Sequence, residues 1–439
     1  MEVSSSNDKR PLEYQNHYEA ISTQSMRLGR TNWYTRGWTF QEYLFSRRRL
    51  VFHDNTVNWE CHCSAWYENQ YLPHVSSPCT KKPPRNNMGF DPAPWPDLYR
   101  YARLVALYNK RSLTFPEDVL TAFAGVTSVL ESSFDGGFIS GLPQMFFDSA
   151  LLWQPHQPLK RREALRDRSS IPSWSWIGWQ GDLHSESWRS GYDYLRGNPD
   201  EEVDIDTEGR EIRSPITWQT ESCVEWFYSE FQNSQKYPIQ VSSQHFRHSN
   251  PQETPPGWTI VNPEQGSAYY THISDPNQGF WYPIPIAPST PAPTSLCQPG
   301  FLHALTRRCT LTFGRTYTNR NASACKSCDL LTADGTWAGC LRLNIAQDTE
   351  VYYFGGEGRQ CHLVQLSFGD VADIKVERVS FDEWYREGCK KERAAGRYRF
   401  VNVLWVEEME GVVFRRALGR VLRRAWDEVA GDPVSVVFG

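Results

Sequence analysis

The segment from Arg36 to Glu42, Arg-Gly-Trp-Thr-Phe-Gln-Glu, groups residue types that can bind a small polar ligand. Arg36 carries a permanent cation whose planar donors suit a carboxylate or a phosphate. Glu42 can act as an acid, a base or an acceptor for hydroxyls, and Gln41 can donate and accept hydrogen bonds. Trp38 offers a flat wall for a ring, so the group could hold a nucleotide sugar. Spacing alone favours a simpler interpretation, in which Arg36 and Glu42 satisfy each other or backbone groups and Trp38 lies in the core.

Cysteines are the second group of residues that could do chemistry. The chain has 11 of them at irregular spacing, which fits reduced thiols better than a disulfide framework. One cluster has some metal-ligand character: Cys309, Cys325, Cys328 and Cys340. A structural zinc site usually has two paired knuckles, whereas only Cys325 and Cys328 form a C-x-x-C pair. Ordinary thiols are therefore favoured, and no metal or other cofactor is predicted.

The chain is also rich in aromatic residues, with 18 Trp, 21 Tyr and 22 Phe. In the stretch IPSWSWIGWQG, the residues from Ser173 to Trp176 alternate strictly, which predicts a strand with a tryptophan face. Because the tryptophans are spread over the whole chain, a Trp-rich core is the favoured explanation. The alternative is a glycan-binding module in which Trp174, Trp176 and Trp179 form the platform.

The elements that position these residues follow from periodicity. Trp38, Glu42 and Phe45 fall at i, i+4 and i+7, which predicts a short helix from Thr39 to about Ser46 with these three on one face. The alternation that follows, interrupted by Asp-Asn, predicts a β-hairpin over residues 49–61.

Three longer helices are expected next. The first runs from about Leu98 to Asn109. The second opens with a capping box formed by Thr114 and Glu117, with Asp118 in its first turn, where the helix dipole favours a carboxylate. The third starts near Pro143 and runs to Trp153. Together these amphipathic helices predict a helical layer.

The C-terminal part predicts strands. Short alternating runs such as CTLTF, LRLNI, EVYYF and CHLVQLSF recur after Phe301. A hairpin is expected between 400–406 and 412–415, then a loop and helix within 416–429 and a closing strand. The predicted segments are a poorly ordered or helical 1–30, a helix–hairpin–three-helix region 31–155, a Trp-rich strand and linker 156–232, Pro/Ser/Asn-rich loops 233–300, and a β-rich domain 301–439.

Net charge and the distribution of apolar residues argue against several classes of function. A formal net charge of -5 over 439 residues gives no electrostatic footprint for nucleic acid. No stretch approaches the roughly 20 apolar residues that cross a bilayer. The polar beginning of the chain lacks the apolar core of a secretory signal. We therefore expect an intracellular, cytoplasmic protein with no membrane span.

An ordered set of motifs resembles the fungal heterokaryon-incompatibility (HET) domain. The string from Trp33 to Glu42, followed by Leu44, Ser46, Arg47 and Trp59-Glu60-Cys61, is similar to the third signature block of that family. Further matching positions extend the resemblance over roughly residues 30–180: Tyr108-Asn109-x-Arg111-x-Leu113-Thr114, Asp118, Gly141-Leu142-Pro143, Leu151-Leu152-Trp153 and Pro172–Trp179. The family's first two blocks do not occur before Trp33, so the expectation is a HET domain lacking its N-terminal part, through a truncated gene model or gene decay.

The resemblance implies self/non-self recognition, programmed cell death and innate immunity, with protein partners in incompatibility signalling. It implies an α+β chain: a truncated, TIR-like α/β remnant with a helical layer over 31–155, then a β-rich domain. Some proteins of the TIR fold cleave NAD, so Glu42 becomes the candidate catalytic carboxylate, with Arg36, Gly37, Trp38 and Gln41 around it. Without the first strands the chain is expected to be non-catalytic, and NAD is a substrate only for a complete domain. The resemblance does not predict the oligomeric state. Structural motif residues are Trp59, Arg111, Asp118, Trp174, Trp176 and Trp179.

Overall fold

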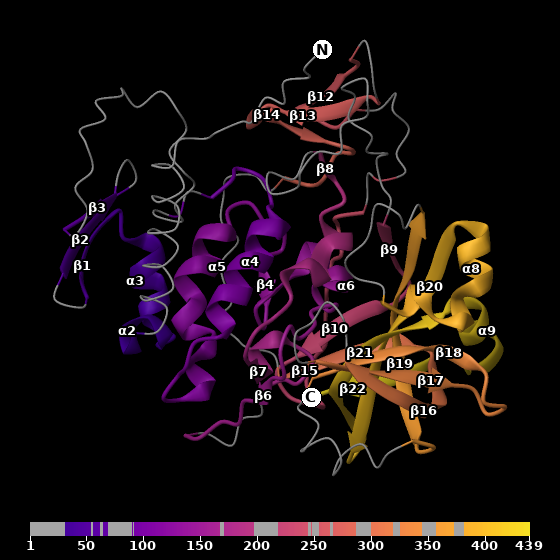
Figure 1. Ribbon diagram of the computed structural model, residues 1–439. Helices are drawn as coiled ribbons and strands as arrows, with labels where there is room; N and C mark the ends of the chain where they lie inside the picture. The colour runs from indigo at the N-terminus through magenta and orange to yellow at the C-terminus, as the bar shows by residue number, and fades with distance from the viewer. Residues whose placement is uncertain are drawn as a thin grey trace, which may run out of the picture. The chain divides into compact units, whose positions relative to one another are not determined.

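The computed structural model describes residues 31–53, 56–61, 65–68, 90, 92–166, 171–196, 218–244, 247, 254–263, 267–286, 300–318, 325–344, 357–372 and 382–439. Over these ranges the chain is a mixed α+β protein dominated by strands (Figure 1). It divides into two compact units. Unit 1 holds the described residues before Pro92 together with Arg111–Leu113, and unit 2 holds the rest. Within these ranges, no helix has the length and apolar character needed to span a bilayer.

Unit 1 consists of two short helices and a small antiparallel sheet. Its elements are α2 (Asn32–Thr35), α3 (Thr39–Phe45), β1 (Arg48–His53), β2 (Thr56–Cys61) and β3 (Ala65–Tyr67). The sheet order is β1-β2-β3, so the predicted short helix and hairpin are confirmed. However, α3 buries Thr39, Phe40 and Leu44 rather than the face of Trp38 and Glu42. The described strands of this unit are antiparallel, unlike those expected of a TIR-like sheet.

The helical part of unit 2 starts with α4 (Leu98–Asn109), which confirms the first predicted helix. The Asp97 side chain caps it by accepting from the Arg100 N–H at 2.8 Å. The second predicted helix is instead broken into three pieces: η1 (Pro116–Val119), η2 (Thr121–Phe123) and α5 (Ala124–Leu130).

The predicted capping box at the start of this region is wrong. The N-cap of η1 is Phe115, not Thr114, and it makes no side-chain capping bond. The Glu117 carboxylate does not reach back along its own helix. It accepts from the backbone N–H groups of Leu165 and Arg166 at 3.2 and 2.9 Å. A distant loop therefore competes successfully for the group that a capping box requires.

The third predicted helix is shorter than expected. It follows the two-residue strands β4 (Phe138–Ile139) and β5 (Leu142–Pro143) and consists of η3 (Gln144–Phe146) and α6 (Phe147–Ala150). The helix ends before Trp153 because the carbonyls of Leu151 and Trp153 accept from the guanidinium of Arg415. This guanidinium is fully buried and lies 3.4 Å over the Trp153 ring.

The tryptophan-rich stretch is not the strand that its alternation predicts. Ser175 caps η4 (Trp176–Gly178) by accepting from the Ile177 N–H, and β7 (Trp179–Gln180) pairs with β6 (Lys160–Arg161). The chain then forms η5 (Ser185–Gly191). A small four-stranded sheet follows, with the order β12-β13-β14-β8. Its strands are β8 (Leu195–Arg196), β12 (Trp258–Val261), β13 (Tyr269–His272) and β14 (Asp275–Phe280).

The large sheet of unit 2 contains eleven strands. They are β9 (Trp218–Ser222), β10 (Glu225–Ser229), β11 (Tyr237–Pro238), β15 (Phe301–Thr306), β16 (Arg308–Thr318), β17 (Lys326–Leu331), β18 (Trp337–Leu343), β19 (Gln360–Ala372), β20 (Arg397–Met409), β21 (Val412–Leu422) and β22 (Val434–Phe438). Six of these pair in a ring, β21-β18-β17-β16-β19-β20, which closes because β20 also pairs with β21. All six pairings are antiparallel.

The main hydrophobic core fills this closed sheet. Each of its six strands contributes to one buried cluster, for example through Leu311, Leu330, Leu341, Leu363, Val403 and Val421. Trp426 of α9 (Arg423–Val429) packs into the same cluster. The other helical pieces near it in sequence are η6 (Asp382–Tyr385), η7 (Glu387–Cys389) and α8 (Lys390–Ala395). Figure 1 shows α8 beside the closed sheet.

The β-rich C-terminal region was correctly predicted, with corrections of extent. The hairpin of β20 and β21 and the helix α9 are confirmed, but residues 416–422 continue β21 instead of forming a loop. The large sheet also takes in β9, β10 and β11, which lie before residue 301. The run EVYYF lies outside the described residues.

Candidate functional site

Two motif segments that are about 75 residues apart in sequence bind each other in unit 1. The Gly37 N–H donates to the Ser112 carbonyl at 2.7 Å, and the Ser112 N–H donates to the Thr35 carbonyl at 2.7 Å. A β-carbon on Gly37 would meet Cδ2 of Leu113 at 2.4 Å, so a larger residue here would have to displace the Leu113 side chain. The Arg-Gly-Trp segment is thus held in place by residues 111–113.

Arg111 is the buried centre of this junction. Its guanidinium donates to the Arg36 carbonyl at 3.2 Å and to Oγ1 of Thr39 at 3.3 Å. It also lies over the rings of Tyr34 and Phe40, at 4.2 and 4.9 Å from their centroids. The role of Arg111 is therefore to fix the start of α3, through hydrogen bonds and cation–π contacts.

A second arginine joins α3 to the hairpin. The Arg49 guanidinium lies 3.8 Å over the ring of Tyr43 and donates to the Tyr43 carbonyl at 3.0 Å. It also pairs with Glu60 on β2 at 2.9 Å. The sequence signal was the basic run 47–49, which does not show which of the three arginines faces the helix. The result is a compact helix–hairpin unit.

The residues predicted to bind a ligand lie on the outer side of this unit. Arg36, Trp38 and Glu42 are exposed, and Gln41 is half-buried. Trp38 is 43% exposed, so it is not the core residue that spacing alone favoured. Among the residues that the structure describes, Arg36 and Glu42 do not form an ion pair. The simpler interpretation of this segment is therefore wrong, and these side chains are accessible to a partner or ligand.

The hairpin sheet presents an apolar face that sequence reasoning missed. Its cross-strand register aligns Leu50 with Trp59 and Trp66, and Phe52 with Val57. These five residues share one side of the pleat and are called here the apolar sheet face. Leu50, Phe52 and Trp66 are 56%, 76% and 67% exposed. The opposite side carries Arg49 and Glu60, whose contacts with Tyr43 and with each other join it to α3.

The three tryptophans of the predicted glycan platform are fully buried. The Trp176 indole donates to the Tyr101 hydroxyl at 3.1 Å, and that of Trp179 donates to the Ser173 carbonyl at 2.9 Å. The Trp174 carbonyl accepts from the Trp153 indole at 3.0 Å. Since indoles in the core cannot stack on a sugar, the platform prediction is wrong. Their alternation with serine reflects backbone bonding rather than a strand.

Two further motif residues have structural roles. Asn109 donates to the Gly181 carbonyl at 3.1 Å and accepts from Arg162 at 2.9 Å, which ties the end of α4 to the tryptophan-rich stretch. Asp118 lies in the first turn of η1, as predicted, and pairs with Arg166 at 3.4 Å.

The four-cysteine cluster does not assemble. On the paired strands β17 and β18, Cys328 lies opposite Leu341 and Cys340 lies opposite Asp329. Consecutive pairs point to opposite faces of a sheet, so Cys328 faces the core and Cys340 faces the other side. Burial raises the pKa of the Cys309 and Cys328 thiols to about 12. Within the described ranges, no group of three or more metal-ligating side chains converges.

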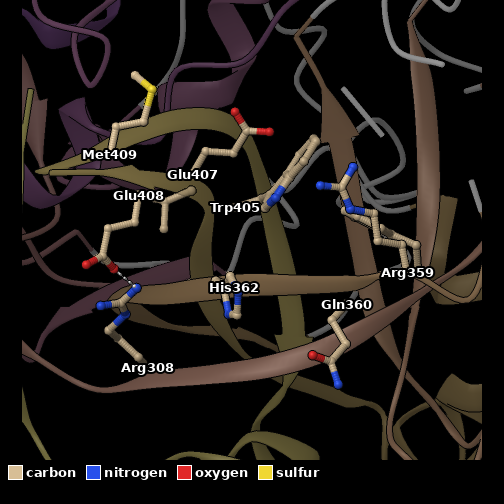
Figure 2. A pocket seen from close by; sticks show the side chains of 10 residues that line it. Arg308, Arg359, Gln360, His362, Trp405, Glu407, Glu408 and Met409 are labelled. Carbon is tan, nitrogen blue, oxygen red and sulfur yellow. Dashed lines mark hydrogen bonds and ion pairs between the residues drawn. The ribbon is translucent and has the colours of Figure 1, made fainter. Parts of the chain in front are cut away.

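A groove of about 700 Å³ lies in unit 2, at one end of the closed sheet (Figure 2). Its walls come from the starts of β16 and β19 and from the end of β20. Trp405 lies at its base and packs edge-on against Phe313, with the ring centroids 5.0 Å apart. Figure 2 shows Arg359 beside the Trp405 indole, whereas the ion pair of Arg308 and Glu408, 2.9 Å long, lies at the other end.

The groove exists because two strands separate. The β19–β20 ladder ends at the pair His362 and Val406. Beyond it, β19 continues through 360–361 alongside β16, and β20 continues through 407–409 alongside β21. We call this opening the β19–β20 groove. Strand separation depends on non-local pairing, so the sequence alone gave no sign of it.

Comparisons of the chain with protein-family models, with characterised proteins and with solved structures give no match. Function is therefore inferred from the residues and their geometry.

Proposed function

We propose that this chain is a signalling protein of the heterokaryon-incompatibility type, which acts by protein–protein contact in fungal self/non-self recognition and programmed cell death. The apolar sheet face of unit 1 is the observation that carries the proposal. Exposed apolar patches on soluble proteins are typical of interaction sites, and the tryptophans and phenylalanine of this face are residue types enriched at protein interfaces.

The motif set gives independent support. The HET-like blocks around Arg36–Thr39 and Arg111–Leu113 bind each other directly, so their order and spacing have a physical reason. The junction fixes α3, and Arg49 fixes the hairpin against α3. In this proposal unit 1 presents the recognition surface, and the β-rich part of unit 2 regulates the response.

The proposal is tested by inducing the full chain in a filamentous fungus and counting hyphal compartments that take up a vital dye. Phe52→Ser and Trp66→Ser should reduce cell death at least tenfold at equal protein level, because each removes an exposed apolar side chain without opening the core. Arg47→Ser, an exposed change next to the same hairpin, is the matched control and should kill like the wild type. Equal killing by all variants, or none by the wild type, would contradict the proposal.

NAD hydrolysis by Glu42 is the second candidate function, supported by the exposed carboxylate on the same short helix segment as Trp38. The purified chain would be incubated with NAD, and nicotinamide release measured for the wild type and for Glu42→Ala. Release that depends on Glu42 would support this function in place of simple contact signalling. Equal nicotinamide release by both proteins would contradict NAD hydrolysis by Glu42.

A further inference from the structure

The geometry points to a second binding site, independent of unit 1: the β19–β20 groove takes an extended peptide that pairs with the free edge of β20 and anchors an apolar side chain on Trp405. The free edge is the first observation. Glu407, Glu408 and Met409 pair with β21 on one side and, in the part of the chain that the structure describes, with no strand on the other.

Such an edge exposes backbone donors and acceptors in strand geometry. An added strand can satisfy them, which is how peptides bind by β-augmentation. The facing edge, formed by Gln360 and Cys361, likewise pairs only with β16 among the described strands. A chain lying in the groove therefore meets a strand edge on each side.

The floor of the groove determines the side chain that would bind there. The base is the edge of Trp405, which is 8% exposed and rests on the buried Phe313 ring, and Met409, which is 55% exposed, forms part of the wall. Aromatic rings and a thioether favour an apolar or aromatic anchor side chain.

Both carboxylates of the groove and its histidine already have partners. Glu408 pairs with Arg308 at 2.9 Å, and Glu407 accepts from Nε of Arg416 at 2.8 Å. His362 hydrogen-bonds Thr310 at 3.1 Å. Paired carboxylates do not call for a strongly charged ligand, so the groove suits a neutral peptide backbone better than a phosphate-bearing molecule.

The test uses fluorescence anisotropy with the full chain and octapeptides that carry fluorescein at the N-terminus and an amide at the C-terminus and are built of threonine around one central residue. The peptide with central phenylalanine should bind saturably, and the peptides with central aspartate or lysine at least tenfold more weakly. Two further phenylalanine peptides carry N-methyl groups on alternate amides, one on each edge. At least one of these two peptides should bind tenfold or more weakly than its parent, because N-methylation removes the N–H groups that form ladder hydrogen bonds.

Variants locate the site. Trp405→Ala should weaken binding of the phenylalanine peptide at least tenfold. Met409→Asp, at an exposed wall position that the fold tolerates, should also weaken it at least tenfold, and it replaces Trp405→Ala if that variant does not fold. Lys390→Ala, an exposed change on α8, is the control and should bind like the wild type. The inference is overturned if no peptide binds, or if both N-methylated peptides bind as tightly as their parent. It is also overturned if Met409→Asp does not change the affinity for the phenylalanine peptide. Tighter binding of chitin oligosaccharides, cellulose oligosaccharides or ATP than of the phenylalanine peptide would overturn it as well.

Discussion

At the scale of single residues, Arg111 determines the geometry of the segment that carries Trp38 and Glu42. Its guanidinium is buried and bonded to Arg36 and Thr39. Arg111→Met keeps the bulk but leaves the Arg36 carbonyl without this donor. We expect a loss of about 2–4 kcal/mol in the free energy of unfolding of unit 1.

The measurement for Arg111→Met is amide hydrogen exchange at Gly37 and Ser112, whose N–H groups donate to the carbonyls of Ser112 and Thr35 across the junction. Arg103→Met, an exposed arginine on α4, is the control. Unchanged protection at both amides would show that the junction does not depend on Arg111.

Gly37 gives a second prediction at this scale. Gly37→Ala places a methyl group 2.4 Å from Cδ2 of Leu113, so it should cost about 1–3 kcal/mol of stability. In a Leu113→Ala background that clash is gone, and the same change should cost less than about 1 kcal/mol. A double-mutant cycle by urea unfolding measures the difference. Additive effects would mean that the two residues do not touch in solution.

At the scale of elements, the β20–β21 hairpin depends on its two-residue turn. Glu410 and Gly411 both have positive φ, 53° and 77°, as a type I′ turn requires. Glu410 is a poor residue for that conformation, whereas asparagine adopts it readily. Glu410→Asn should therefore stabilise the protein by about 0.5–1 kcal/mol, and Gly411→Val should destabilise it by about 1–2 kcal/mol. Thermal unfolding checks both, and a lower melting temperature for Glu410→Asn would contradict the assignment of the turn.

Elements whose signal is local were predictable from the sequence. The helix α4, the β1–β2 hairpin and the β20–β21 hairpin follow from periodicity and turn residues, because neighbours in sequence decide them. The Arg36–Glu42 segment was singled out as a candidate site, but its buried face was assigned to the wrong side. Phe40 and Leu44 are also apolar at helical spacing, and only the position of Arg111 shows which face is covered.

Elements decided by distant partners were not predictable. Glu117 would form a capping box if the backbone of Leu165 and Arg166 did not bind it. Ser173–Trp176 alternates like a strand, but its groups bond to Arg415 and to other indoles. The β19–β20 groove depends on where a ladder ends, which is set by the register of a closed sheet and not by composition.

At the scale of the whole molecule, Asp148 links the helical part of unit 2 to the large sheet. This carboxylate lies on α6, is fully buried, and accepts from Ser222 on β9 and from the Trp226 indole on β10, the latter at 2.7 Å. Burial raises its pKa from 3.8 to about 6, against the effect of the two hydrogen bonds. Because the burial effect is the larger one, the folded state is most stable relative to the unfolded state when Asp148 carries a proton.

The sign of the pH effect follows from this raised pKa. Between about pH 4 and 6 the folded state binds more protons at Asp148 than the unfolded state does. The contribution of Asp148 to the free energy of unfolding is therefore greatest below pH 4 and falls as the pH rises through 6. Asp148→Asn should remove that slope and raise the stability at pH 7.5 by about 1–3 kcal/mol. Urea unfolding from pH 4.5 to 7.5 measures it, with Asp370→Asn, on an exposed ion pair, as the control. An unchanged slope in Asp148→Asn would contradict the pKa direction.

The guanidinium of Arg415 has a consequence for biosynthesis. It bonds the carbonyls of Leu151 and Trp153, which leave the ribosome 264 and 262 residues earlier. At about 5–20 residues per second, the nascent chain carries these two carbonyls and the Trp153 indole without their cation for on the order of tens of seconds. Chaperones that bind apolar segments should therefore associate with translation intermediates stalled before β21, and should leave once that strand has emerged.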